Sequence, residues 1–208
     1  MKQVMEKLLG LNTYAEELGI NLDTEEGRFK WFLASILFAK RISSEIAKKT
    51  YQEFEKSGIF DPESIIKAGW DRLVEVLDSG GYVRYDFSTA SKLLEIAASL
   101  KEKYGSLDNL YAQSSDSRDL EKRLLEFKGV GPTTVNIFLR ELKGDWEKAR
   151  PPLSPQAKEI APRLGLSKEE IELPNVESVL VRINLEFCRH RRCSECAMRD
   201  ECQVAQSA

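Results

Sequence analysis

The sequence predicts an all-α protein. Apolar residues recur at intervals of three and four along most of the 208 residues, the spacing that gathers them on one face of a helix. No stretch alternates apolar with polar residues as a half-buried strand does. Ser, Asp and Pro precede these stretches and Gly follows them, as at helix starts and ends. About ten short helices are therefore expected, and no sheet.

Four helices are expected before the break at Gly80-Gly81. A core helix over 24–40 carries an apolar face, and the next helix follows the Ser43-Ser44 cap. Asp61-Pro62 begins a short helix that Gly69 ends, and a further helix fills the interval up to the break.

The rest of the chain continues the helical pattern. A long helix stops at Gly105, and 144–153 is the one long connection that looks irregular. Ser154-Pro155 supplies a helix cap and first turn, and Ser167 to Glu170 forms a capping box. The apolar stripes of these later helices include Leu93, Leu124, Val135, Ala157 and Val179.

Composition restricts the kinds of partner that the chain can have. It is 42% hydrophobic and carries a net charge of −3, with a pI of about 5.5. Its apolar runs are too short to span a membrane and no signal peptide is recognised, so a cytoplasmic protein without membrane contact is expected. Bulk charge does not attract nucleic acid, and any such binding must come from local basic patches.

Four cysteines, the only ones in the chain, lie within fifteen residues near its end. They are Cys188, Cys193, Cys196 and Cys202, in the pattern C-x4-C-x2-C-x5-C. Four thiolates so close in sequence can converge on one metal centre. Two disulfides are an alternative that suits secreted proteins better. A 4Fe-4S cluster is favoured, because its ligands often form one compact run, and structural zinc stays open as the alternative.

A glycine-containing turn joins two of the expected helices. It reads Lys128-Gly129-Val130-Gly131-Pro132. The two glycines permit positive φ and a close approach of the backbone to a ligand, and Pro132 suits the first helical position. Free amides at the helix start, the helix dipole and Lys128 would together attract a phosphate. The alternative is an ordinary corner between helices, in which the glycines serve only geometry.

The turn and the cysteine run together resemble the endonuclease III superfamily of DNA glycosylases. Gly129-Val130-Gly131 looks like the hairpin of that family's helix-hairpin-helix. The cysteine run is similar to its 4Fe-4S loop, although the first gap is four residues here and six there. Ile36–Lys40 falls where the family has its first core helix, and Arg163–Leu166 is similar to the helix after its catalytic aspartate. Gly81-Tyr82 looks like a turn of 8-oxoguanine glycosylases.

This resemblance implies a fold of two lobes. Residues 25–133 would form a six-helix lobe ending in the hairpin, and 1–24 with 134–208 would form the cluster lobe. Double-stranded DNA would lie across the cleft of a monomer, with the target base flipped out of the duplex.

Two positions depart from the chemistry of the family. Thr133 stands where bifunctional members have the lysine that forms a Schiff base with the sugar, so the usual lyase step should be absent. Ser154 stands where the family has an aspartate that steadies the cationic sugar, and a helix cap is its alternative role. Asp145 and Glu147, in the preceding loop, are the nearest substitute acids. The catalytic residues are therefore not assigned.

Several other residues are candidates for DNA contact. The hairpin residues Lys128–Gly131 and Thr133 are expected to meet the backbone of the DNA. Lys40 either fills the gap left by a flipped base or contacts a phosphate, and a solvated lysine at a helix end is its alternative role. Tyr82 and Tyr85 either stack on a base or pack inward. The densest basic cluster, which would bind phosphate unless it is merely a solvated loop, lies inside the first cysteine gap. It consists of Arg189, His190, Arg191 and Arg192.

Two functions of different classes follow from these features. The first is a monofunctional DNA glycosylase for base excision repair, which hydrolyses the bond to a damaged or modified base. The second is a non-catalytic relative that binds damaged or distorted DNA. The first requires a carboxylate near the pocket and the second does not. An electron carrier is a distant third.

Overall fold

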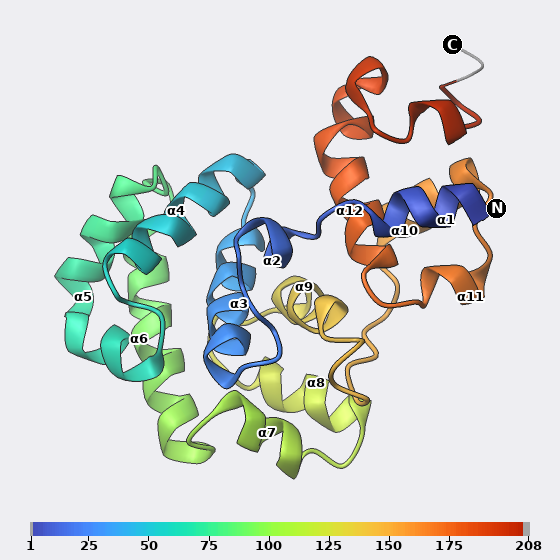
Figure 1. Ribbon diagram of the computed structural model, residues 1–208. Coiled ribbons are helices and arrows are strands. Elements are labelled where there is room, and N and C mark those ends of the chain that lie inside the picture. The colour runs from blue at the N-terminus through green and yellow to red at the C-terminus, as the bar shows by residue number, and fades with distance from the viewer. Residues whose placement is uncertain (1, 206–208) are drawn as a thin grey trace. The chain divides into compact units, whose positions relative to one another are not determined.

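The computed structural model describes residues 2–205, and within that range the chain forms helices and no strand (Figure 1). This confirms the all-α prediction. The chain divides into a middle unit, Leu18–Phe138, and a terminal unit, which combines Met1–Glu17 with Leu139–Ala208. The predicted boundaries follow residues 24 and 133, whereas the observed ones follow residues 17 and 138. No helix in the described range has the length and apolar character needed to cross a membrane.

Most of the helices match the predicted ones. The middle unit contains α3 (Glu25–Phe38), α4 (Ser44–Lys56), α5 (Pro62–Ser79), α6 (Asp86–Lys103), α7 (Leu107–Gln113), α8 (Ser117–Leu125) and most of α9 (Pro132–Glu141). The terminal unit contains α1 (Lys2–Leu9), α2 (Tyr14–Glu17), α10 (Pro155–Ile160), α11 (Lys168–Ile171), α12 (Val176–Glu186) and the 3₁₀ turns η1 (Ala161–Leu164), η2 (Cys188–His190), η3 (Cys193–Glu195) and η4 (Arg199–Glu201). The sequence did not predict α1, α2 and α7, because helices of eight, four and seven residues show too little of the repeat.

Local hydrogen bonds account for the predicted helix ends. The hydroxyl of Thr24 accepts from the amide of Gly27 at 3.0 Å and caps α3. Ser167 and Glu170 cap α11 reciprocally, which confirms the capping box. Gly69, with φ of +73°, kinks α5 instead of ending it. The chain resumes its helical path at once, so the two helices predicted on either side of Gly69 form one bent element.

Helix α3 is the core of the middle unit. Trp31 and Phe32 are fully buried, because this helix is apolar on nearly every side. The indole of Trp31 donates to the carbonyl of Phe138 at 3.2 Å. The ring of Phe32 packs edge-on against Phe138, at 5.1 Å between centroids, and against Phe127, at 6.4 Å. These contacts fasten both helices of the glycine-containing turn to α3.

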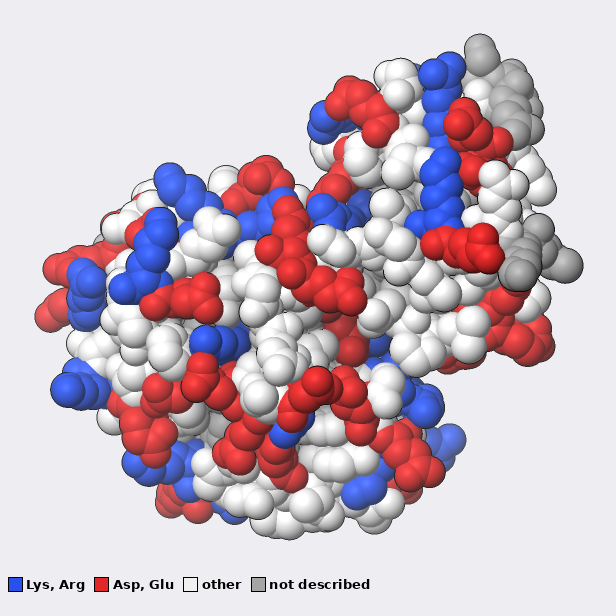
Figure 2. Space-filling model, viewed as in Figure 1, with Lys and Arg blue, Asp and Glu red and all other residues white. Residues whose placement is uncertain are grey.

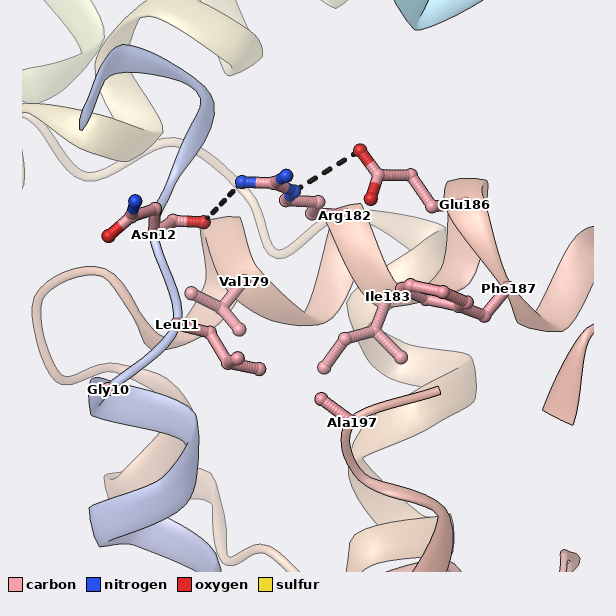
Figure 3. Close-up of a pocket in the computed structure, with 9 residues that line it drawn as sticks. All are labelled: Gly10, Leu11, Asn12, Val179, Arg182, Ile183, Glu186, Phe187 and Ala197. Atoms are coloured by element: carbon pink, nitrogen blue, oxygen red, sulfur yellow. Dashed lines mark hydrogen bonds and ion pairs between the residues drawn. The ribbon is translucent and has the colours of Figure 1, made fainter. Parts of the chain in front are cut away.

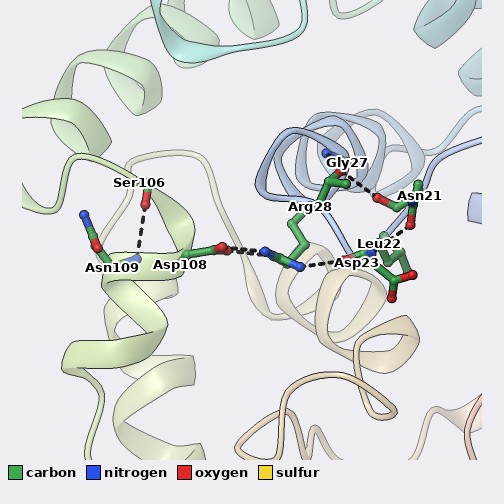
Figure 4. A network of polar contacts seen from close by, with 9 residues as sticks. Asn21, Leu22, Asp23, Gly27, Arg28, Ser106, Asp108 and Asn109 are labelled. Carbon is green, nitrogen blue, oxygen red and sulfur yellow. Dashed lines mark hydrogen bonds and ion pairs between the residues drawn. The ribbon is translucent and has the colours of Figure 1, made fainter.

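A polar network holds the start of α3 to α7. The guanidinium of Arg28 donates through Nε to Asp108 Oδ1 at 2.7 Å and through Nη1 to the carbonyl of Leu22 at 2.7 Å (Figure 4). Arg28 and Asp108 lie 80 residues apart in sequence, and the paired geometry is one that arginine forms well with a carboxylate. The network therefore links the beginning of the middle unit's chain to α7, far along the same unit.

The core of the terminal unit is built around α12. Its buried apolar residues pack with those of α10 and with Leu8 of α1. Three of the four cysteines lie at the edge of this cluster, together with the fully buried Met198. The cysteine loop, residues 188–202, is therefore attached to the core of the terminal unit by part of its length only.

Candidate functional site

The glycine-containing turn is a hairpin between two helices. Helix α8 ends at Leu125, and after the hairpin turn, residues 126–131, α9 begins at Pro132. The amide of Val130 donates to the carbonyl of Phe127 at 3.0 Å and closes the turn. Both of these side chains are buried, with 1% of Phe127 exposed and 6% of Val130. Packing therefore holds the turn while Lys128 and Gly129 stay at the surface.

The two glycines of the hairpin turn have different roles. Gly129 has φ of +98°, and a Cβ there would lie 2.6 Å from the side chain of Lys92. Gly131 does not have positive φ, and a Cβ there would meet nothing within 4 Å. The predicted need for positive φ therefore holds at Gly129 alone, while Gly131 leaves open space beside the backbone.

The start of α9 offers free hydrogen-bond donors. Among residues 2–205, the amides of Gly131, Thr133 and Thr134 have no acceptor. Pro132 has no amide proton, and the hydroxyl-bearing residue Thr133 is exposed. These donors stand at the positive end of the α9 dipole, where an anion is favoured.

Three lysines lie close to the hairpin turn. Lys128 pairs with Glu95 at 2.9 Å, but 79% and 45% of the two side chains are exposed, so the pair is weak and displaceable. Lys40 is half-buried beside Lys92, and burial followed by the charge of Lys92 lowers the pKa of Lys40. Sequence reasoning missed Lys92, because a lysine in the middle of a long helix carries no local signal.

Basic residues on the molecular surface are mixed with acids. Figure 2 shows Lys and Arg interspersed with Asp and Glu over the visible face, in agreement with the net charge of −3. Anion binding therefore depends on local arrangements of donors.

Tyr82 is a core residue, which corrects the expectation that it contacts DNA. Its side chain is fully buried, and its hydroxyl donates to the carbonyl of Leu37 at 3.1 Å. The turn at Gly81 directs the ring inward, so stacking on a base would require the core to open. Tyr85 is half-buried at 6.1 Å from the ring of Tyr82, and the guanidinium of Arg84 lies over it.

Ser154 has the role of a helix cap. Its hydroxyl accepts from the amide of Ala157 at 3.4 Å at the start of α10, and 4% of the residue is exposed. Its own amide donates to Glu177 at 2.8 Å. Asp145 and Glu147 are both exposed, in the connection between α9 and α10. Neither carboxylate forms a hydrogen bond with Ser154 among the described residues.

Glu177 is a buried acid that sequence reasoning missed. Besides the amide of Ser154, its carboxylate accepts from Lys143 at 2.6 Å, and at most 2% of either charged side chain is exposed. The residue lies inside the apolar stripe of α12, 23 positions after Ser154, where nothing in the sequence signals a contact. Because both charges are paired and shielded from water, Glu177 anchors the cap of α10 on α12.

The cysteine loop consists of short 3₁₀ turns. Cys188 and Cys193 begin η2 and η3, whereas Cys196 and Cys202 follow η3 and η4. All four are free thiols, without a disulfide. Within residues 2–205, no group of three or more His, Cys, Asp or Glu side chains has a metal-binding arrangement.

The chemistry of the four thiols nevertheless suits a soft metal. Cys188, Cys196 and Cys202 are half-buried against apolar side chains, and Cys193 is exposed. Burial followed by the negative charge of the other three thiolates raises the pKa of Cys188 to about 11. The thiols therefore lie near enough to repel one another when ionised, a repulsion that a bound cation would reverse.

The basic residues of the cysteine loop are all exposed. Arg192 forms an ion pair with Glu195, and neither Arg189 nor Arg191 has an ion pair within the described residues. Arg191 has φ of +56°, and its amide donates to the carbonyl of Cys188 at 3.1 Å. His190 is exposed as well. Between Cys188 and Cys193 the loop thus presents two arginines, Arg189 and Arg191, that are available for a ligand.

A cavity of about 300 Å³ lies elsewhere in the terminal unit (Figure 3). It is lined by the chain after α1, one side of α12 and Ala197 of the cysteine loop. Arg182 crosses one side of it, donating to the carbonyl of Asn12 at 2.8 Å and to Glu186 at 3.2 Å. None of the predicted site residues lines this cavity.

No protein-family model matches the sequence, and no curated protein is similar to it at a significant level. The functional argument therefore rests on the residues and their geometry.

Proposed function

We propose that the protein binds double-stranded DNA through its helix-hairpin-helix and acts as a monofunctional DNA glycosylase on a damaged or modified base. The observation that carries this proposal is the start of α9 at the hairpin turn, where the amides of Gly131, the exposed Thr133 and the buried Thr134 have no acceptor. Backbone amides at a helix start are good ligands for phosphate oxygens. The resemblance to the endonuclease III superfamily, in which such a hairpin precedes a four-cysteine loop, adds the glycosylase activity.

The four cysteines would hold a 4Fe-4S cluster that orders the cysteine loop. The cluster's part is to tie together a segment with a single fully buried side chain, Met198, and so to present Arg189 and Arg191 to DNA. Iron and acid-labile sulfide in the purified protein, with visible absorption, would support this assignment. Zinc without visible absorption would support the structural zinc site instead.

Thr133 determines the expected product. A hydroxyl cannot form an imine with the sugar, so base release should leave an abasic site in an uncut strand. The cap residue Ser154 stands where the family has its aspartate, so another acid is needed. The exposed Asp145, in the preceding loop, is the candidate. A carboxylate about 4 Å from the developing sugar cation contributes about 4 kcal/mol at an effective dielectric of ~20, or roughly a thousandfold in rate.

The role of Ser154 favours a second candidate function. A residue whose hydroxyl caps α10 and whose amide is bonded to the buried Glu177 takes part in structure and supplies no charge. A non-catalytic relative that recognises damaged or distorted DNA would need the hairpin and the cysteine loop but no acid.

Base release from duplexes carrying a panel of damaged or modified bases separates these two functions. We expect release without strand cutting, and no covalent adduct on borohydride treatment. Asp145→Asn should abolish release if Asp145 is the acid, with Glu147→Gln as the matched control from the same loop. Tight binding with no release from any duplex would establish the non-catalytic function, and failure to bind any duplex would refute both.

A further inference from the structure

Two lysines from different helices meet beside the hairpin turn. Lys40 lies two residues after α3, and Lys92 lies in the middle of α6. Burial and then the neighbouring positive charge of Lys92 lower the pKa of Lys40, so the two side chains lie near each other. Neither lysine has an acidic partner among the described residues. The two positive charges therefore face each other uncompensated.

The stem of Lys92 runs against the backbone of Gly129. A Cβ at Gly129 would lie 2.6 Å from Cδ and 2.7 Å from Cγ of Lys92, so only glycine leaves room for the lysine. The contact places the aliphatic stem of Lys92 against the hairpin turn. Glu95, one turn further along α6, is the acid that would be expected to neutralise Lys92, but it pairs with Lys128 instead.

An arrangement of this kind is unfavourable in the free protein. Like charges in contact repel, and burial of Lys40 increases the cost. An anion placed between the two ammonium groups removes the repulsion and forms two charge-assisted hydrogen bonds. Residues that lower stability in the free protein and gain a partner on binding are typical of functional sites.

A backbone phosphate is the anion that fits the surroundings best. The amides of Gly131, Thr133 and Thr134, which belong to the same hairpin, add neutral donors without acceptors. Several backbone amides combined with lysines form the usual donor set for phosphate oxygens. A carboxylate would use the two lysines equally well but would leave more of these amides without a partner.

We infer that Lys40 and Lys92 form a clamp that holds one phosphate of the DNA backbone beside Gly129. The inference rests on the proposed function, because it takes the ligand to be DNA. It assigns a binding role to Lys92, and among the roles predicted for Lys40 it selects the phosphate contact, shared with Lys92, over the gap left by a flipped base.

The test compares Lys40→Gln, Lys92→Gln and the double variant with Lys101→Gln. Lys101 lies on the same helix as Lys92, carries the same charge and pairs with Glu63 at 2.8 Å. Affinity for an undamaged duplex is measured over a range of salt concentrations. The double variant should reduce the slope of log affinity against log salt by about 0.9, the value for one phosphate, while Lys101→Gln leaves it unchanged. An unchanged slope in the double variant would show that neither lysine binds a phosphate. A reduction of about 1.8 would show that each lysine binds its own phosphate. Either result would overturn the shared clamp.

Two further measurements separate this inference from the proposed function. Inorganic phosphate is titrated into the protein alone, while the amide resonances of Gly129 and Gly131 are followed by NMR. Saturable shifts that disappear in the double variant support the clamp, even if no duplex is bound and the proposed function fails. Shifts that persist unchanged in the double variant contradict the clamp, even if DNA is bound.

Thermal unfolding checks for a structural role of the two lysines. Removing one of two repelling charges should leave the unfolding temperature unchanged or raise it. The inference is contradicted if the double variant unfolds at a lower temperature and, while still folded, shows the same phosphate-induced NMR shifts as the wild type. That result would show that the two lysines support the fold.

Discussion

Phe127 and Val130 hold the hairpin turn against the core of the middle unit, whereas the cysteine loop has Met198 as its one fully buried side chain. The hairpin turn is also closed by the bond from the amide of Val130 to the carbonyl of Phe127. The loop has only single 3₁₀ turns and thiols at the edge of an apolar cluster. Packing therefore accounts for the hairpin turn, whereas the cysteine loop has little packing of its own, and the proposed metal would add the stability that packing does not supply.

Removal of a cysteine should have the largest effect. Cys196→Ser should abolish binding of the proposed metal and unfold the cysteine loop, because a structural metal, where one is bound, contributes about 10 kcal/mol or more of binding free energy to folding. Metal analysis and thermal unfolding would measure this, with Ser194→Ala, from the same turn, as the control. Amide resonances of the hairpin turn should not move. Full metal content in Cys196→Ser would show that the loop does not depend on this thiol.

Removal of the Phe127 ring tests whether packing holds the hairpin turn. Phe127→Ala should lower the free energy of unfolding by about 3–5 kcal/mol, because it leaves a cavity next to Phe32 and Tyr104. Leu125→Ala, at a side chain that is 42% exposed, should cost much less. Both values come from denaturant unfolding. Equal losses in the two variants would mean that packing at Phe127 does not hold the turn.

Within the terminal unit, Glu141 and the cysteine loop should respond to pH in opposite directions. Burial, opposed by Arg140 and by the amide of Ala15, raises the pKa of Glu141, at the end of α9, to about 7. The folded protein keeps a proton that the unfolded chain releases, so this stability is full below about pH 4.5 and is lost as pH rises through about 7. About 3 kcal/mol is involved at 1.36 kcal/mol for each pH unit. Metal binding by thiolates instead weakens as pH falls.

Unfolding free energies between pH 4 and pH 8 would measure the effect of Glu141, with Glu141→Gln as the comparison. The variant should lose the decline above pH 5 that Glu141 causes in the wild type. Parallel curves for the two proteins would contradict a raised pKa at this position.

The two glycines of the hairpin turn separate its folding from its binding. Gly129→Ala should lower the free energy of unfolding by about 1–2 kcal/mol, because alanine at φ of +98° is strained and Lys92 must move. Gly131→Ala should leave stability nearly unchanged, yet weaken DNA binding, because its methyl group would project into the open space beside the backbone. If Gly131→Ala binds DNA with normal affinity, DNA does not approach the backbone closely at Gly131.

The arginines of the cysteine loop should show the smallest effect. Arg191→Gln should weaken DNA binding a few-fold, because Arg191 has no ion pair to give up within residues 2–205. Arg192→Gln should weaken it less, since Arg192 must first leave Glu195. The reverse order would indicate that the ion pair between Arg192 and Glu195 does not hold Arg192 back from DNA. Affinity at fixed low salt is the measurement.

Most of the longer helices, their main starts and the hairpin between α8 and α9 could be predicted from the sequence alone. Caps such as Thr24, Ser154 and Ser167 act through hydrogen bonds that reach three residues along the chain, so they are readable from local sequence. The cysteine spacing likewise placed four thiols in one loop. Helices of one or two turns, such as α2, gave too short a pattern to be recognised.

Only the tertiary structure decided which side chains meet across the fold. It turned Tyr82 into the core, 45 residues from its partner Leu37, and brought Glu177 to the amide of Ser154. It also brought Lys92 to Lys40. Contacts of this kind depend on how whole helices pack, and packing is set by the sum of many apolar contacts. No local pattern around a single lysine or glutamate carries that information.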